Sequence, residues 1–402
     1  MNTPPIHDIV VFGATGFTGR LATLKLASDP SLHLAIAGRN RKKLEDLQKE
    51  CAHKPAIIDA DSKDKGSITA MVRQAKVVAN FAGPFALYAE PVIAACSELG
   101  RAYCDITGET PFIRDMIDRY EHVAQATGAC LIPMAGFDSV PADVMSYIAL
   151  EEASRHGWDV DDLKHYYRVK GGFNGGTLLS VLTMAEQKKN KHLIDSNILI
   201  PDKKWAHNPK VEFKPTFEPF LKRWSAPFLM NSINTAVVRR SIYLRNPESR
   251  DSQNIAYTER SLLSKGRSGN LAAYGVIGAL GIMDVMTGNG IGRAILRKLG
   301  PSAGQGPSEK SRKEGFYRGT LIAREKARPR LTVKMKASGD PGNEFTVLCA
   351  TTIAKLLVKT EKTRTVRGFQ TPTSALGDPL IAALEAGGVT ITTAYVDALV
   401  KF

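Results

Sequence analysis

Paired cysteines are absent from this chain of 402 residues. The five cysteines are odd in number and show no spacing typical of a metal cluster or a redox pair; they are Cys51, Cys96, Cys104, Cys130 and Cys349. This excludes a disulfide scaffold, and we expect reduced thiols that behave as small apolar side chains. The eight histidines form no ligand pair at helical spacing, so no metal is predicted.

A basic residue and an apolar run are also lacking at the start of this sequence, so no secretory leader is expected. The chain begins Met-Asn-Thr-Pro-Pro-Ile-His-Asp, which lacks the charge and the apolar run of a secretory signal. We therefore expect an intracellular protein that is either cytoplasmic or peripherally attached to a membrane or lipid droplet. With 43% apolar and 23% charged residues, the composition excludes collagen, coiled coils and wholly disordered chains. The length favours two domains.

Acidic residues are scarce in the second half of the chain. Residues 1–150 carry 15 Lys and Arg against 17 Asp and Glu, whereas residues 151–402 carry 39 against 23. This asymmetry predicts a basic surface that faces something anionic. Nucleic acid is not favoured as that partner, because no recognised binding motif or aromatic-basic platform accompanies the bases.

Short apolar strands alternate with helices through residues 1–150. Such alternation predicts a doubly wound parallel sheet with helices on both faces, the Rossmann arrangement of an α/β protein. We expect residues 151–375 to form a second, basic α+β domain that binds substrate and contains an insertion over 185–330. Residues 376–402 are expected to form a C-terminal helix and tail, and 300–319 a mobile loop.

Glycines at three-residue spacing occupy the turn between the first strand and the first helix. Gly13, Gly16 and Gly19 allow a tight turn and a close approach of the backbone to a dinucleotide pyrophosphate, which the helix N-terminus then binds. Thr15 and Thr18 add hydroxyl donors. The strand before the turn and the helix after it favour cofactor binding over a merely structural turn.

The second strand predicts which dinucleotide is bound. It ends in Gly38-Arg39-Asn40-Arg41-Lys42-Lys43, without the acid that holds the ribose hydroxyls of NAD. Arg39 can clamp a 2′-phosphate and stack on adenine, so NADP(H) is favoured; the alternative is a solvated basic helix start. Asp59 and Asp61 either border adenine or cap a helix. The predicted cofactor-binding residues are Gly13, Thr15, Gly16, Phe17, Thr18, Gly19, Arg39, Asn40, Asn80, Ala82, Gly83 and Pro84.

Several further stretches, together with the glycine turn and Ala37-Gly-Arg39, resemble the saccharopine dehydrogenase-like oxidoreductases, including the group called trans-acting enoyl reductases. They are Asn80-Phe-Ala-Gly-Pro-Phe85 with Tyr88, Tyr103-Cys-Asp-Ile-Thr-Gly-Glu109, Gly136-Phe-Asp-Ser-Val-Pro-Ala-Asp143, Gly175-Gly-Thr-Leu-Leu-Ser180, Gly306-Pro-Ser308 and Thr371-Pro-Thr-Ser-Ala-Leu-Gly377. Residues 185–300 match loosely, and Asn343 stands where the family commonly has Tyr.

The resemblance implies an NADPH-dependent reductase with a Rossmann domain and a second α+β domain. Similar members are associated with lipid and polyketide-derived chains, so we expect an enoyl or related unsaturated, lipid-like substrate. The alternatives are an imine or amino-acid dehydrogenase like the saccharopine enzymes, and a membrane-associated scaffold without turnover. No basic pocket for several carboxylates can be identified from spacing.

Two residues are candidates for catalysis. Tyr88 follows the Gly83-Pro84 turn and can present a phenol to the nicotinamide, or it simply packs. Asp105 lies at the C-terminal end of the fifth strand, where open α/β sheets bind ligands, or it caps a turn. Asp138, Ser139 and Asp143 surround a helix start, where capping is the favoured role.

One uncharged stretch, residues 268–283, is apolar and flanked by basic residues. Sixteen helical residues span about 24 Å, less than a bilayer core, and three glycines weaken the helix. A full span is therefore not predicted. Apolar residues between bases suit an interfacial segment on anionic lipid; the alternatives are a buried helix or the interface of a homo-oligomer.

Overall fold

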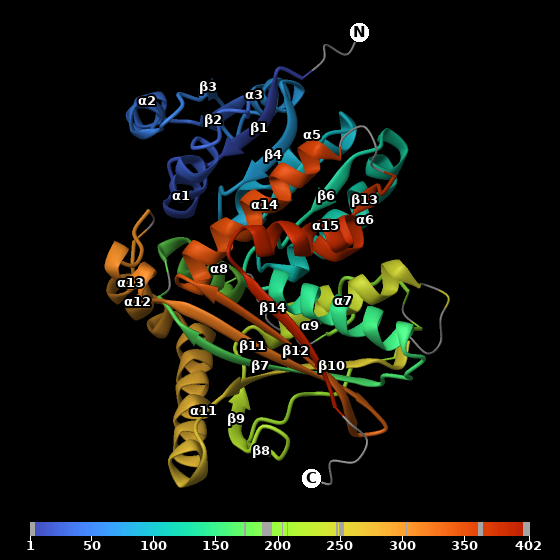
Figure 1. Ribbon diagram of the computed structural model, residues 1–402. Helices are drawn as coiled ribbons and strands as arrows, with labels where there is room; N and C mark the ends of the chain where they lie inside the picture. The colour runs from blue at the N-terminus through green and yellow to red at the C-terminus, as the bar shows by residue number, and fades with distance from the viewer. Residues whose placement is uncertain are drawn as a thin grey trace.

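A computed structural model describes residues 5–172, 174–186, 195–202, 204–206, 208–246, 248, 253–302, 304–360 and 365–396. Two seven-stranded sheets, one above the other in Figure 1, organise this part of the chain. The upper sheet A lies between helices, and the lower sheet B carries helices between itself and sheet A. The predicted α/β class, with a Rossmann sheet and a second α+β unit, is confirmed.

Sheet A is entirely parallel, with strand order β13-β6-β5-β4-β1-β2-β3. Its inner strands are fully buried apolar runs, as a sheet covered on both faces requires. Its strands are β1 (His7–Phe12), β2 (Leu34–Gly38), β3 (Ala56–Asp59), β4 (Ala75–Asn80), β5 (Ala102–Asp105), β6 (Cys130–Ile132) and β13 (Gly368–Phe369). The helices between them are α1 (Phe17–Leu26), α2 (Arg41–Glu50), α3 (Lys65–Arg73), α4 (Phe85–Tyr88), α5 (Glu90–Glu98) and α6 (Thr110–Thr127).

Sheet B is mixed, with strand order β14-β12-β11-β7-β10-β9-β8. Only β7 and β10 pair in parallel. Its strands are β7 (Asp162–Lys170), β8 (Thr216–Glu218), β9 (Arg223–Pro227), β10 (Ala256–Leu262), β11 (Phe316–Glu325), β12 (Arg328–Ser338) and β14 (Thr390–Tyr395). Helices α7 (Val140–Arg155) and α9 (Asn231–Arg245) pack on one face. Its strands alternate buried apolar and exposed charged residues where the other face meets solvent.

The chain returns from sheet B to sheet A near its end. Helix α14 (Thr346–Lys359) packs on β1, β4 and β5, and β13 extends sheet A beyond β6. The kinked α15 (Pro372–Ala386) follows, and β14 then joins the edge of sheet B. The division at 150 and 375 therefore differs from the path of the chain, because both sheets need elements from the C-terminal part. Residues 397–402 of the predicted tail lie outside the described residues.

The expected loop over 300–319 holds regular structure. It contains α13 (Glu309–Lys313) and the start of β11, whose residues 316–319 pair with both β7 and β12. The loop prediction was wrong there because sheet pairing outweighs the local glycine and serine content.

A long apolar helix projects beside sheet B (Figure 1). It is α11 (Gly266–Gly288), which is followed at once by α12 (Gly290–Leu299); α8 (Gly175–Glu186) lies near its upper end. Among the described helices α11 alone is long and apolar enough to cross a membrane, and 11% of its most apolar window is buried. The alternative of a buried helix is therefore wrong for the single chain, and the three glycines do not interrupt it.

Candidate functional site

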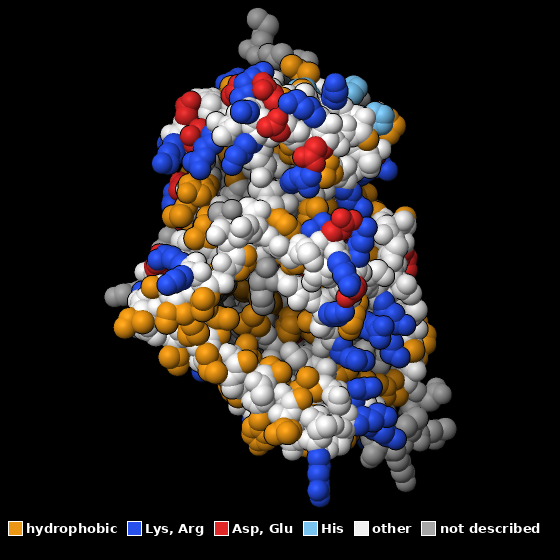
Figure 2. Space-filling model, turned by 90° about the vertical axis from the view of Figure 1, so that its left-hand side faces the viewer, with side chains coloured by type: hydrophobic (Ala, Val, Ile, Leu, Met, Phe, Trp, Pro, Cys, Tyr) orange, Lys and Arg blue, Asp and Glu red, His pale blue; other side chains and the backbone are white. Residues whose placement is uncertain are grey.

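One large cavity lies between the carboxyl ends of the sheet A strands and the helices around sheet B. Its volume is about 1290 Å³, more than a typical single-ligand pocket. Figure 2 shows a hollow in the middle of one face, with apolar side chains gathered around it. The cavity therefore has room for a dinucleotide and a second molecule.

The glycine turn forms the nucleotide end of this cavity. Gly13 has a φ of +75°, and a Cβ on it would lie 2.7 Å from the Ala82 backbone nitrogen. A Cβ on Gly19 would lie 2.3 Å from the Gly13 carbonyl oxygen. Both contacts exclude any side chain, so the turn needs glycine to bring β1, α1 and the end of β4 together. Gly13 and Gly16 line the cavity, whereas Gly19 packs below them.

Helix α1 begins at this turn without a side-chain cap or an acidic residue in its first turn. Its first N–H groups and its partial positive charge are thus available to an anion. Thr15, Phe17 and Thr18 line the cavity beside them, and the Arg312 guanidinium stacks over the Phe17 ring at 5.5 Å.

Arg39 is exposed at the end of β2 and lines the cavity, and it has no hydrogen bond or ion pair within the described residues. Its neighbour Arg41 pairs with Asp59 and Glu45. Asp61 lines the cavity near Arg39, whereas Asn40 lies outside it and accepts a hydrogen bond from the Lys43 N–H at the start of α2. Among the described residues that line the nucleotide end, Arg39 is thus a cation without an ion pair.

The end of β4 forms the opposite wall. Asn80 is buried and outside the cavity lining: its Nδ2 donates to the Tyr103 hydroxyl at 3.0 Å, and its Oδ1 accepts from the Ala82 N–H at 2.9 Å. It therefore shapes the turn that brings Ala82 and Gly83 to the cavity. Pro84 is buried behind them and precedes α4.

These residues fit a phosphorylated dinucleotide. The turn formed by Gly13 and Gly16, here called the glycine cradle, lets a pyrophosphate approach the backbone, and the uncapped start of α1 complements its charge. The unpaired Arg39 guanidinium can bind a 2′-phosphate. When bound, NADPH supplies a hydride to the neighbouring end of the cavity. Among the described residues, no group of His, Cys, Asp or Glu side chains is placed to hold a metal ion.

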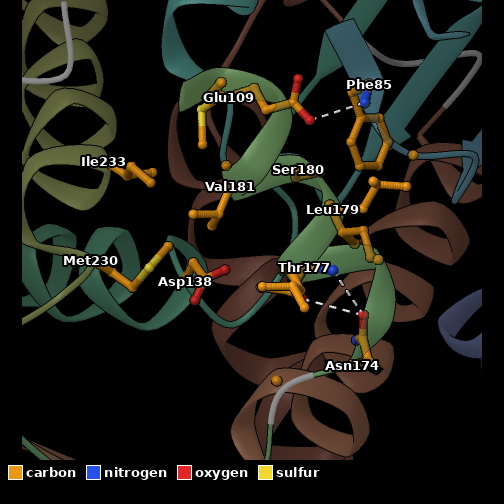
Figure 3. A pocket seen from close by; sticks show the side chains of 18 of the residues that line it. Phe85, Glu109, Asp138, Asn174, Thr177, Leu179, Ser180, Val181, Met230 and Ile233 are labelled. Carbon is orange, nitrogen blue, oxygen red and sulfur yellow. Dashed lines mark hydrogen bonds between the residues drawn. The ribbon is translucent and has the colours of Figure 1, made fainter. Parts of the chain in front are cut away.

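Tyr88 lines the cavity from α4, which a buried carboxylate holds in place. The Glu109 Oε1 accepts from the Phe85 N–H at 3.0 Å (Figure 3). Its Oε2 accepts from the Ala86 N–H at 2.8 Å. Glu109 thus caps the short helix that carries Tyr88, and both residues border the same space.

Asp105 is fully buried and is not among the cavity-lining residues. Its carboxylate accepts hydrogen bonds from the Tyr103 hydroxyl at 2.7 Å and from the N–H groups of Thr107 and Met134 at 3.0 Å. Burial raises its pKa to about 6, although these hydrogen bonds lower it. With these contacts, Asp105 fixes the loops after β5 and β6.

Asp138 borders the cavity, although the sequence favoured a role in capping a helix. It precedes α7, lines the cavity, and has no hydrogen bond or ion pair within the described residues. Figure 3 shows its carboxyl group among Thr177, Val181 and Met230. Burial raises its pKa to about 6, so both its protonated and ionised forms are accessible near neutral pH. Asp143, in contrast, binds Thr373 and Ser241 within the protein.

A buried polar cluster lies close enough to Asp138 to interact with it electrostatically. Glu259 accepts hydrogen bonds from the hydroxyls of Tyr167 and Tyr257 and from the Asn234 amide. Burial, with a smaller contribution from the Asp138 charge, raises the pKa of Glu259 to about 8, although its hydrogen bonds lower it. Tyr167 stacks on Phe228, a cavity residue, at 4.1 Å. No sequence motif pointed to this cluster, because its members come from three separate elements.

Asn343, which stands where the family commonly has Tyr, has a structural role. The Asn174 side chain caps α8 by accepting from the Thr177 N–H at 3.0 Å (Figure 3). Its Nδ2 donates to the Asn343 Oδ1 at 2.8 Å, and Asn343 in turn donates to Asp340. Asn343 therefore fixes the start of α8, a wall of the cavity.

Beyond the nucleotide end, the cavity wall is mostly apolar. The charged residues there are Glu109, Asp138, Lys210 and Asp284. The apolar residues come from α8, α9, α11, α12 and neighbouring loops, and they include Leu178, Leu179, Val181, Met184, Val211, Phe213, Phe228, Leu229, Met230, Ile233, Leu280, Met283, Leu296 and Leu299.

Comparison with known proteins agrees with this geometry. Residues 9–132 match the family model described as the saccharopine dehydrogenase NADP binding domain. A protein of Mycobacterium tuberculosis named as a trans-acting enoyl reductase is 32% identical over 97% of this chain and 98% of its own length. A trans-acting enoyl reductase of Mycobacterium leprae is 29% identical over 96% of this chain and 97% of its own. Saccharopine dehydrogenase of Saccharomyces cerevisiae shares the fold, with a TM-score of 0.57 at 12% identity over 97% of this chain and all of that one.

Fold, cradle and comparisons together define an NADP-dependent oxidoreductase of the Rossmann type. The chain belongs to the saccharopine dehydrogenase-like family, within its trans-acting enoyl reductase group.

Proposed function

We propose that the protein uses NADPH to reduce the carbon–carbon double bond of an α,β-unsaturated acyl substrate with a long apolar chain. The observation that carries this proposal is the wall of the cavity beyond the nucleotide end. It offers three acids and one lysine among many aliphatic and aromatic side chains. An amino-acid substrate with several carboxylates would meet repulsion there, whereas a neutral apolar chain would replace water along the wall.

The reduction also needs a proton at the carbon next to the carbonyl. Asp138 supplies it in this proposal, because its carboxyl group faces the cavity and has a pKa of about 6. The protonated carboxyl donates to the substrate α-carbon, and its carboxylate regains a proton from solvent. Glu109 contributes by holding the α4 start, so that Tyr88 borders the same space.

Isotope transfer tests this function. The protein is incubated with NADPH deuterated at the nicotinamide C4 and either a long-chain trans-2-enoyl thioester or an amine paired with a 2-keto acid. We expect one deuterium at the β-carbon of a saturated thioester, and in D₂O one solvent deuterium at the α-carbon. Label in a new amine would replace the proposal by an imine dehydrogenase, and NADPH binding without any transfer would favour a scaffold.

A further inference from the structure

The outward face of α11 is apolar although it meets solvent. Leu271, Ile282 and Val285 are 74%, 64% and 67% exposed, and Tyr274 lies on the same side. Their spacing of three, eight and three residues along the helix keeps them on one stripe. On α12, Ile291 and Leu299 are 78% and 79% exposed. So many exposed large apolar side chains on two successive helices are unusual on a soluble monomer and indicate a contact site.

The inward side of α11 is part of the enzyme. Ala273 is buried where the helix packs along β9, and Leu280 and Met283 line the cavity. Thr287 is buried at the other end, where α12 follows at once. Both ends thus contact the fold, so the helix cannot cross a bilayer without losing its packing on sheet B. A helix held in this way can lie in the membrane interface.

Charge distinguishes a lipid surface from a second copy of the chain. Residues 265–298 carry five bases, Lys265, Arg267, Arg293, Arg297 and Lys298, against one acid, Asp284. Two of these bases, Arg293 and Arg297, pair with Glu186 of α8. Within the described residues the other three have no ion pair. A symmetric dimer would bring the same bases close to one another, which costs free energy. An anionic membrane would attract the excess positive charge, and Lys265, Arg267 and Lys298 could pair directly with lipid headgroups. Figure 2 shows a column of Lys and Arg side chains on the same face of the molecule as the apolar side chains.

We infer that α11 and α12 dock the protein onto an anionic lipid bilayer, with the stripe of Leu271, Ile282 and Val285 inserted at the headgroup boundary. This goes beyond the proposed function and does not depend on it. Because the other side of α11 lines the cavity, docking also places the cavity wall one helix away from the lipid.

Vesicle flotation of the full-length protein tests this inference. We expect binding to vesicles of phosphatidylcholine with phosphatidylglycerol, and weaker binding to phosphatidylcholine alone or at high salt. The triple variant Leu271→Ser, Ile282→Ser, Val285→Ser should lower the partition coefficient at least about tenfold. Ile6→Ser, an exposed apolar residue beside sheet A, is the matched control and should change nothing.

A charge variant tests the electrostatic part of this inference separately. Lys265→Glu with Arg267→Glu should weaken binding to anionic vesicles, whereas Lys54→Glu with Lys359→Glu makes the same change in net charge elsewhere and should not. Circular dichroism and NADPH binding confirm that each variant is folded. The inference is overturned by absence of flotation with either vesicle, by flotation that survives the triple variant, or by a dimer in light scattering that the triple variant dissociates.

Discussion

The two ends of the cavity are built in different ways. The nucleotide end is built from backbone. Gly13, Gly16 and the uncapped start of α1 lie within one short connection, and Ala82, just after the neighbouring strand β4, packs against Gly13. The substrate end comes from side chains of α8, α9, α11 and α12, which are spread over more than a hundred residues. Cofactor recognition here depends on local backbone geometry, whereas substrate recognition depends on how distant helices assemble.

Asp138, between the glycine cradle and the apolar wall, should show the largest effect. Asp138→Asn removes the proposed proton donor, so kcat should fall about a thousandfold while NADPH affinity stays unchanged. In the wild type, kcat/KM should decline as pH rises above about 6, because the donor then loses its proton. Steady-state kinetics against pH, with NADPH titration, measures both.

Asp284→Asn is the control for this prediction. Asp284 also lines the cavity but is exposed on α11, so its neutralisation should leave kcat and the pH profile nearly unchanged. Equal losses in both variants would mean that the general charge of the cavity, rather than a proton from Asp138, sets the rate.

One added methyl group at Gly13 should be enough to disrupt NADPH binding at the nucleotide end. Gly13→Ala places a Cβ against Ala82 at a positive φ, so we expect NADPH affinity to fall about a hundredfold, with lower thermal stability. Gly278→Ala is the matched change, because its Cβ would meet open space on α11. Fluorescence titration and thermal unfolding compare the two variants. Unchanged NADPH affinity and stability in Gly13→Ala would contradict the role of the glycine cradle in cofactor binding.

Cofactor choice should be affected less. Arg39→Ala should weaken NADPH binding about tenfold and leave NADH binding nearly unchanged, because only NADPH carries the 2′-phosphate. Arg41→Ala, next to it but paired with Asp59, should have little effect on either. Titration with both cofactors decides the matter: if the wild type binds NADH more tightly, the role of Arg39 is wrong.

The smallest effect on activity is expected behind the substrate end, where the change is in stability. Glu259 has a folded pKa of about 8 against an ordinary value of 4.5. Its contribution to stability is therefore present below pH 4.5 and is lost as pH rises through 8. Glu259→Gln removes this loss, so its free energy of unfolding relative to the wild type should rise between these pH values. Urea unfolding at several pH values measures the difference, and a constant difference would contradict the raised pKa.

Sheet A and the nucleotide end could be predicted from the sequence. Their signals are local: buried apolar strands, helices between them, glycines within one turn, and Arg39 where an acid usually stands. Backbone sterics and strand period act over a few residues, so the pattern itself contains the information. The return of β13 to sheet A was missed, since a two-residue strand has no pattern of its own.

Only the tertiary structure decided the roles of the carboxylates and of α11. The sequence made Asp105, at the end of β5, a candidate for catalysis and favoured a capping role for Asp138, after β6. The fold instead surrounds Asp105 with donors and leaves Asp138 facing the cavity. Likewise, an apolar run has the same sequence pattern whether it is buried or exposed. In α11, packing leaves the stripe of Leu271, Ile282 and Val285 exposed. Burial and hydrogen-bond partners come from segments far apart in the chain, which no local pattern records.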